Sequence, residues 1–345
     1  MKKQYIWIDR IKLLACLLVV AGHFFTSMVL CNIMETNIFL EWFLKTIYYF
    51  HVPLFFICSG YLYQNGCKIT NLKEWKRNIT KKAIALGVPY ILFSSITIIM
   101  KVLAADSVNN KAPNFMNTLL FDPIAPYWFV YILFFMFVFT KTYQNKKNMI
   151  VSSTIAFVAK ILIISVQQTN LYDILPYFIK GVAINEIWFV IGMNCRYLCE
   201  PDELLEKCKN WPKFISVFII AIIISITIIC FNVSSQIIYF IDGMLFCYSF
   251  IGLAIYFSKY KMDKIELFLS KYTLSIFLMH TIFAAGIRII LIKLGIVNTF
   301  IHILGGLMAS IILPIIAEEI MKKSKLFYFW IYPNKVLKRK AEKTE

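Results

Sequence analysis

The sequence predicts an all-α integral membrane protein, a bundle of about ten transmembrane helices with both termini cytoplasmic. Three observations support this fold class. Hydrophobic residues fill 60% of the 345 positions and charged residues only 16%, whereas a soluble domain carries about a quarter charged residues. The apolar residues form runs of about 20, long enough to cross a bilayer as a helix. Lys and Arg concentrate in alternate connections between these runs.

Ten apolar segments are predicted to span the membrane. In chain order they are 13–30, 42–63, 83–103, 124–141, 149–167, 182–199, 214–231, 237–257, 273–292 and 299–321. No repeat or long linker divides the chain, so we expect one membrane domain over 1–345, with a basic cytoplasmic tail at 322–345. The longest predicted outer loop, 104–123, is either a lid or acceptor platform, or an ordinary solvated loop. Its polar residues include Asp106, Asn109, Asn110, Asn114 and Asp122.

The distribution of basic residues predicts the orientation. With the N-terminus inside, 29 of the 36 Lys and Arg residues fall in inner segments. This bias follows the positive-inside rule and favours an even number of spans. It also accounts for the net charge of +17 without a nucleic-acid partner. We therefore expect a multi-pass protein of the cell membrane.

Histidines occur only in the predicted spans, at His23, His51, His280 and His302. Ionisable groups in a span usually face the bundle interior and mark function. Eleven helical steps of about 100° place His23 and Lys12 on one face, about 16 Å apart. The two side chains either line a common channel, in which a neutral imidazole can take a proton, or serve as a helix–helix hydrogen bonder and an ordinary basic flank.

The second span contains an unusual polar stretch, HVPLFFICSGYLY, with His51, Pro53, Ser59 and Gly60. Pro53 frees a backbone carbonyl near His51, and the Ser59-Gly60 pair permits close helix approach. These residues are expected to bend the helix around a cavity. Ser59 as a nucleophile is the weaker interpretation, because no G-x-S-x-G elbow accompanies it.

Glu186 and Arg288 are isolated opposite charges in the sixth and ninth spans, at a similar predicted outer depth. We expect them to form an ion pair across the bundle, with a role at the substrate as the alternative. No metal is expected, because the histidines lack Cys or carboxylate partners at ligand spacing.

A basic cluster precedes the third span. It comprises Lys73, Lys76, Arg77, Lys81 and Lys82. The cluster either holds the phosphates of a nucleotide-bearing donor or lies against anionic lipid.

Taken together, these segments resemble the acyltransferase 3 family of membrane-bound O-acyltransferases, of the sugar O-acetylase type. The family's basic residue, ten positions and histidine are matched by Lys12 and His23 in IDRIKLLACLLVVAGH. Four later stretches match in order: FFICSGYL, PYWFVYILFF with Trp128, WFVIGMNCRYL with Gly192, and YTLSIFLMH ending in His280. KRNITKKAIA departs from the paired-arginine motif that is frequent in the family.

The resemblance implies transfer of an acetyl group from cytoplasmic acetyl-CoA to a hydroxyl of an envelope carbohydrate or lipid-linked saccharide. It implies that His23 is the catalytic base and that Lys12 lies near the donor. The other expected site residues are Arg77, Lys81 and Lys82 for acyl-CoA, and His51, Ser59, Trp128, Glu186, His280 and Arg288 along a channel or acceptor site.

Two other classes of protein fit the same composition. A transporter or flippase of a lipid-linked saccharide or polysaccharide also needs intramembrane charges and wet cavities, although the sequence has no inverted repeat. A membrane scaffold without chemistry is the third class. The sequence leaves open the sugar, the acyl group, a homo-oligomer and a separate extracytoplasmic partner.

Overall fold

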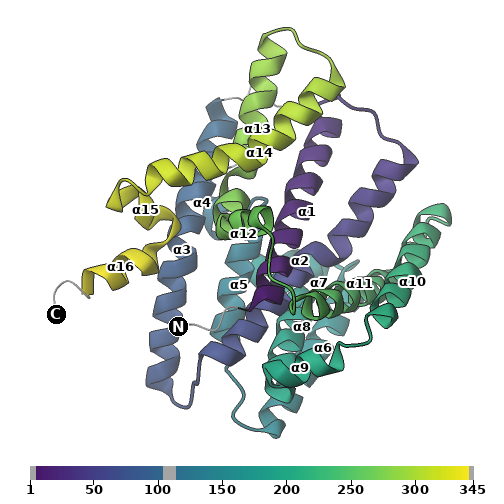
Figure 1. The fold of residues 1–345 in the computed structure, drawn as a ribbon, viewed down its shortest axis with the longest axis vertical. Helices are drawn as coiled ribbons and strands as arrows, with labels where there is room; N and C mark the ends of the chain where they lie inside the picture. The colour runs from purple at the N-terminus through teal and green to yellow at the C-terminus, as the bar shows by residue number, and fades with distance from the viewer. Residues whose placement is uncertain (1–4, 104–113, 342–345) are drawn as a thin grey trace.

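The computed structural model describes residues 5–103 and 114–341, and all regular elements in these ranges are α-helices (Figure 1). The predicted all-α membrane bundle is confirmed. Of the predicted outer loop, Asp106, Asn109 and Asn110 lie outside the described residues. In chain order the helices are α1 (Ile6–Leu30), α2 (Ile38–Gly66), α3 (Leu72–Leu103), α4 (Phe115–Leu120), α5 (Trp128–Phe139), α6 (Lys146–Val166), α7 (Asn170–Ile174), α8 (Tyr177–Leu198), α9 (Pro201–Lys207), α10 (Trp211–Cys230), α11 (Gln236–Phe257), α12 (Lys264–Lys271), α13 (Thr273–Lys293), α14 (Thr299–Met321), α15 (Lys325–Ile331) and α16 (Pro333–Ala341).

The predicted spans agree with the helices, apart from the fourth. Span 299–321 coincides with α14, whereas 124–141 contains only the 12-residue α5. At 1.5 Å per residue α5 is about 18 Å long, shorter than a hydrocarbon core of about 30 Å. Its backbone becomes extended at Thr140, whose carbonyl accepts a hydrogen bond from Tyr63 at 3.0 Å.

Eight helices in the described ranges are long and apolar enough to cross a membrane. They are α1, α3, α6, α8, α10, α11, α13 and α14. α2 and α5, which cover the other two predicted spans, do not meet both requirements. The count of ten spans and the cytoplasmic placement of the termini stay predictions.

α2 and α8 cross at unusually close range because each contributes a glycine. A Cβ atom built on Gly60 would lie 1.9 Å from the carbonyl oxygen of Phe189, and one on Gly192 would lie 1.9 Å from that of Ile57. No side chain fits at either position. Small residues that bring helix backbones together are typical of membrane bundles, so the close approach predicted at Gly60 is confirmed.

α2 continues through Pro53, which supplies no amide proton to the carbonyl of Tyr49, four residues earlier. α11 packs against this carbonyl through Gly243, where a Cβ atom would lie 2.5 Å from the Tyr49 oxygen. The sequence therefore correctly places a freed carbonyl beside His51. It does not predict that α11 covers it.

One end of the bundle carries the basic connections, here called the basic end. It gathers the first turns of α1 and α3 with the last turns of α2, α8 and α11. Tyr5 and Arg196 both donate to Asn65, at 3.1 and 2.7 Å, and Arg10 donates to the Phe257 carbonyl at 2.5 Å. The described part of the tail forms α15 and α16, which pack beside α3 (Figure 1).

Candidate active site

α1 is continuous from Ile6 to Leu30, so Lys12 and His23 share one helix, as predicted. Both side chains are half-buried. Helical geometry keeps them on one face, with Lys12 toward the basic end and His23 deep in the bundle. α1 therefore presents a cation and an imidazole in the same direction, about 16 Å apart.

His23 meets a second histidine, His280 of α13. Their ring centroids are 5.5 Å apart and the rings are tilted by 41°. The Nδ1 atom of His280 lies 2.9 Å from the carbonyl oxygen of Phe277 and 3.1 Å from that of Ile276. A carbonyl oxygen only accepts, so the proton of the neutral ring sits on Nδ1. Nε2 of His280 is then a proton acceptor, and it is buried without a hydrogen bond in the described part of the chain.

His51 of α2 forms a third vertex beside this pair. It is buried, its Nδ1 lies 2.5 Å from the carbonyl of Ile47, and its ring packs edge-on against Tyr48 at 4.9 Å. His51 interacts electrostatically with His23. Three of the four histidines thus converge from α1, α2 and α13. Within the described ranges, no three His, Cys, Asp or Glu side chains are arranged to hold a metal ion.

His302 is separate from this cluster. Its Nε2 lies 2.8 Å from the Ile296 carbonyl near the start of α14, and its ring is buried. Its Nδ1, like Nε2 of His280, is buried without a hydrogen bond in the described part of the chain. What separates His302 from the cluster is its position, because no ring contact joins it to the other histidines within the described ranges. It therefore provides a matched control for His23 and His280.

The basic cluster divides into an inner and an outer part. Lys82 is half-buried, lies 3.9 Å from the centre of the Phe137 ring and interacts electrostatically with Lys12. Arg77 and Lys81 are exposed on α3, and the Lys81 carbonyl accepts a hydrogen bond from Asn334 of α16 at 3.3 Å. The structure thus brings Lys82 toward Lys12 and leaves the other two cations at the surface.

The predicted ion pair between Glu186 and Arg288 is wrong. Arg288 donates to Ser27, one turn beyond His23 on α1. Glu186 accepts from Thr140 at 2.5 Å, at the end of α5 that faces the basic end, and its Oε2 atom has no hydrogen-bond partner among the described residues. The two charges lie at different depths: Arg288 reaches Ser27 in the last turn of α1, whereas Glu186 is near the middle of α8. α8 also presents Glu186 to α5 and not to α13.

Ser59 and Trp128 are both half-buried at helix-packing positions. Ser59 is half-buried beside the α2–α8 glycine contact, and Trp128 is half-buried at the start of α5, where it packs on the main hydrophobic core. Within the described ranges, neither side chain makes a polar contact that would activate it. The neighbouring Tyr127 is fully buried and donates to the carbonyl of Leu278 at 2.9 Å, which fixes α5 against the His280 segment.

Three charged residues were not singled out from the sequence. Lys101 of α3 interacts electrostatically with His23. Lys160 of α6 is buried, donates to the Ile184 carbonyl at 2.9 Å and lies 4.5 Å from the centre of the Phe240 ring. Asp242 of α11 is fully buried. A charge inside an apolar run was the signal available for each of them.

With this geometry in place, a comparison of the sequence with family models gives the class of protein. The model of an acyltransferase domain, that of the acyltransferase 3 family, matches residues 5–319, nearly the whole chain. The chain belongs to the acyltransferase 3 family and is a multi-pass membrane acyltransferase. No curated protein and no solved structure matches it.

Proposed function

We propose that the protein is an O-acetyltransferase of the cell membrane. It moves an acetyl group from cytoplasmic acetyl-CoA to a hydroxyl of an envelope carbohydrate or lipid-linked saccharide. The observation that carries the proposal is the contact between His23 of α1 and His280 of α13, whose ring centroids are 5.5 Å apart. α1 also presents Lys12 toward the basic end. Membership of an acyltransferase family supplies the reaction class.

The chemistry requires a base, because a sugar hydroxyl is a poor nucleophile until its proton is removed. In the proposed step His23 takes the hydroxyl proton while the oxygen attacks the thioester carbonyl carbon. The C–O bond forms and the C–S bond then breaks. The leaving thiolate recovers the proton from the His23 imidazolium, so the products are the acetyl ester and free coenzyme A.

His280 is suited to support His23. Its Nδ1 is held against backbone carbonyls, so its ring orientation is fixed and its unpaired Nε2 faces away from them. A fixed imidazole beside the base stabilises one orientation of the base and of the imidazolium that forms. Lys12 and Lys82 provide positive charge toward the basic end, where the phosphates of the donor are proposed to bind.

The test follows labelled acetyl groups with purified protein in lipid nanodiscs. Wild-type protein is expected to consume labelled acetyl-CoA and to transfer the label to an added glycan fraction, and mass spectrometry is expected to find a mass increase of one acetyl group. His23→Ala is expected to lower the rate by about 10²–10⁴-fold, the usual contribution of a general base. His302→Ala removes an equally intramembrane histidine and is expected to retain activity.

The competing function is transport of a lipid-linked saccharide, which buried charges such as Lys160 and Asp242 would also serve. Acceptor movement across the bilayer without thioester consumption would favour the transporter. A mass increase of one succinyl group would support acyl transfer but show that the acyl group is succinyl and not acetyl. An envelope glycan unaffected by His23→Ala would favour a scaffold.

A further inference from the structure

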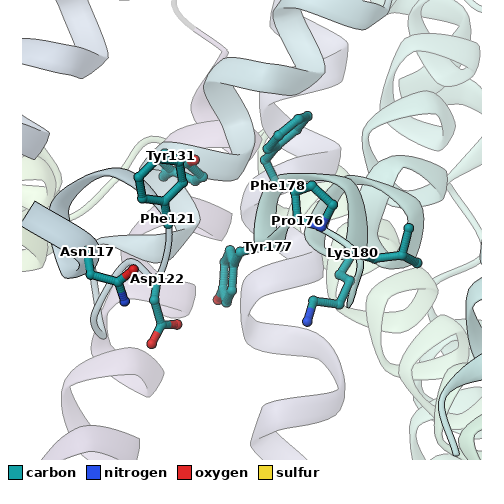
Figure 2. A pocket seen from close by; sticks show the side chains of 9 residues that line it. Asn117, Phe121, Asp122, Tyr131, Pro176, Tyr177, Phe178 and Lys180 are labelled. Atoms are coloured by element: carbon teal, nitrogen blue, oxygen red, sulfur yellow. The ribbon is translucent and has the colours of Figure 1, made fainter. Parts of the chain in front are cut away.

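A polar cleft lies at the end of the bundle opposite the basic end, between the α4–α5 connection and the start of α8. Its volume is about 300 Å³, at the lower end of the range for small-molecule sites. The side chains that line it are chemically mixed: Asn117, Phe121, Asp122, Tyr131, Leu175, Pro176, Tyr177, Phe178 and Lys180. Figure 2 shows Tyr177 standing between Asp122 on one side and Lys180 on the other.

The aromatic wall of the cleft is held in place by its own contacts. Tyr131 donates to the Leu120 carbonyl at 2.8 Å, and its ring centre is 6.4 Å from that of Tyr177. Phe178 stacks on Phe135 at 4.6 Å with an interplanar angle of 20°. The cleft therefore offers rigid aromatic faces next to hydrogen-bonding groups before any ligand arrives. Preformed sites lose less entropy on binding.

The polar groups of the cleft suit a ligand with several hydroxyls. The Asp122 carboxylate lines the cleft and can accept several hydrogen bonds. Asn117 adds an amide that donates and accepts, and Lys180 adds a cation whose Nζ lies 4.7 Å from the centre of the Tyr172 ring. Aromatic faces flanked by such groups match a pyranose ring, which has apolar C–H faces and a polar rim.

A second hollow, entirely apolar in character, adjoins this cleft. It has a volume of about 260 Å³ and runs between α3 and α5. Its lining residues are Ala83, Leu86, Gly87, Tyr90, Ile91, Val130, Tyr131 and Phe134. Tyr131 lines both hollows, so the apolar groove and the polar cleft are adjacent and share this side chain as a common wall.

The groove follows the bundle axis and opens outward. Its α3 residues run from Ala83 to Ile91, eight helical steps or about 12 Å at 1.5 Å per residue. Ile91 at its edge is 53% exposed, and a Cβ atom on Gly87 would meet no heavy atom within 4 Å. In a membrane this surface contacts hydrocarbon, so a chain of a lipid can enter it from the side.

The geometry points to a lipid-linked saccharide as the occupant of this two-part site. One hydrocarbon chain lies in the α3–α5 groove, and the sugar stacks on Tyr177 with its hydroxyls toward Asp122 and Asn117. An ordinary phospholipid can fill only the groove, and a free sugar can fill only the cleft. A glycolipid can occupy both hollows, with Tyr131 between its sugar and its hydrocarbon chain. This inference rests on the proposed function, because it narrows the acceptor to the lipid-linked class.

Photocrosslinking in nanodiscs tests the site without relying on catalysis. The probe is dioleoyl glucosylglycerol with a diazirine in one acyl chain, compared with phosphatidylcholine carrying the same modified chain. The glucosyl probe is expected to label peptides covering 83–91 and 130–134 more strongly than the phosphatidylcholine probe, by about fivefold or more. Tyr177→Ala is expected to remove this preference while leaving the weaker phosphatidylcholine labelling unchanged.

Filling the groove provides the second variant. Gly87→Leu places a side chain in open space and is expected to lower labelling by the glucosyl probe by at least about tenfold. Gly286→Leu is the matched control. It also places its side chain in open space, on α13, and helical geometry turns Gly286 about 120° away from His280. Equal labelling by both probes, or no effect of Gly87→Leu, would overturn the inference.

Acetyl transfer to the two kinds of acceptor separates this inference from the proposed function. If acetyl transfer to methyl glucoside is as fast as transfer to the glucosyl lipid, and crosslinking shows no preference, the inference of a lipid-linked acceptor is wrong. The proposed acetyltransferase activity would still hold. Specific crosslinking of the glucosyl lipid without any acetyl transfer would support the glycolipid-binding site and contradict the proposed acetyltransferase activity.

Discussion

The basic end of the bundle and its middle differ in whether their polar side chains have hydrogen-bond partners. At the basic end, Arg10 of α1 donates to Glu266 at 2.7 Å and to the Phe257 carbonyl at 2.5 Å, which joins α1 to α11 and α12. Thirteen residues further along α1, about 20 Å away, His23 packs against the His280 ring of α13. The Nε2 atom of His280 has no hydrogen-bond partner within the described ranges. α1 thus contributes a paired cation at the basic end, and in the middle it contacts a histidine of α13 that has an unpaired nitrogen within the described ranges.

This difference separates structural from chemical roles. Leaving a buried polar group unpaired costs about 1–3 kcal/mol. The unpaired Nε2 of His280 is singled out because its ring lies beside that of His23, the proposed base. A paired cation at the end of a helix needs no other explanation than stability. We therefore expect substitutions in the middle of the bundle to lower activity without lowering stability, and substitutions at the basic end to do the reverse.

The largest effect is expected for His280→Gln. The kcat of acetyl transfer is expected to fall by at least about 100-fold while KM for acetyl-CoA changes little, because His280 supports the base and is remote from the donor phosphates. The midpoint of thermal unfolding in detergent is expected to change little, because Gln removes the unpaired Nε2 while its amide can still donate to the carbonyls that Nδ1 contacts. His302→Gln is the matched control with near-wild-type kcat. An equal fall in both variants would contradict a special role for the pair.

An intermediate effect is expected for Lys12→Gln, which removes the cation on the His23 face. KM for acetyl-CoA is expected to rise about tenfold, roughly the contribution of one charged hydrogen bond, with kcat largely kept. Arg77→Gln removes an exposed cation and is expected to raise KM less. Steady-state kinetics over a range of salt concentrations measures both. If Arg77→Gln has the larger effect, the donor binds the outer part of the cluster.

The smallest effect on activity, and the clearest on stability, is expected for the Arg10–Glu266 pair. Side chains that are 15% and 23% exposed and bridge distant helices should couple by about 1.5–3 kcal/mol in a double-mutant cycle of unfolding free energy. The exposed Lys45–Glu41 pair within α2 should couple by only about 0.3–0.5 kcal/mol. Equal coupling energies would show that burial does not strengthen the Arg10–Glu266 pair relative to the exposed Lys45–Glu41 pair.

Much of the fold was predictable because helix formation in a membrane depends on local sequence. Long apolar runs must form helices to satisfy their backbone groups, so the limits of α14 and α13 follow from composition alone. α5 is the exception. Its apolar run suggests a full span, but the chain turns extended at Thr140, where a hydrogen bond from Tyr63 on another helix takes up the carbonyl.

The sequence by itself determined the class of fold, the approximate helices and the shared face of Lys12 and His23. These depend on hydrophobicity and on the fixed angle between residues of one helix. Only the tertiary structure decided that His23 meets His280, that Glu186 bonds to Thr140 and Arg288 to Ser27, and that α16 packs on α3. Contacts between helices depend on how each one is rotated and packed, and no spacing along a single chain segment specifies that rotation.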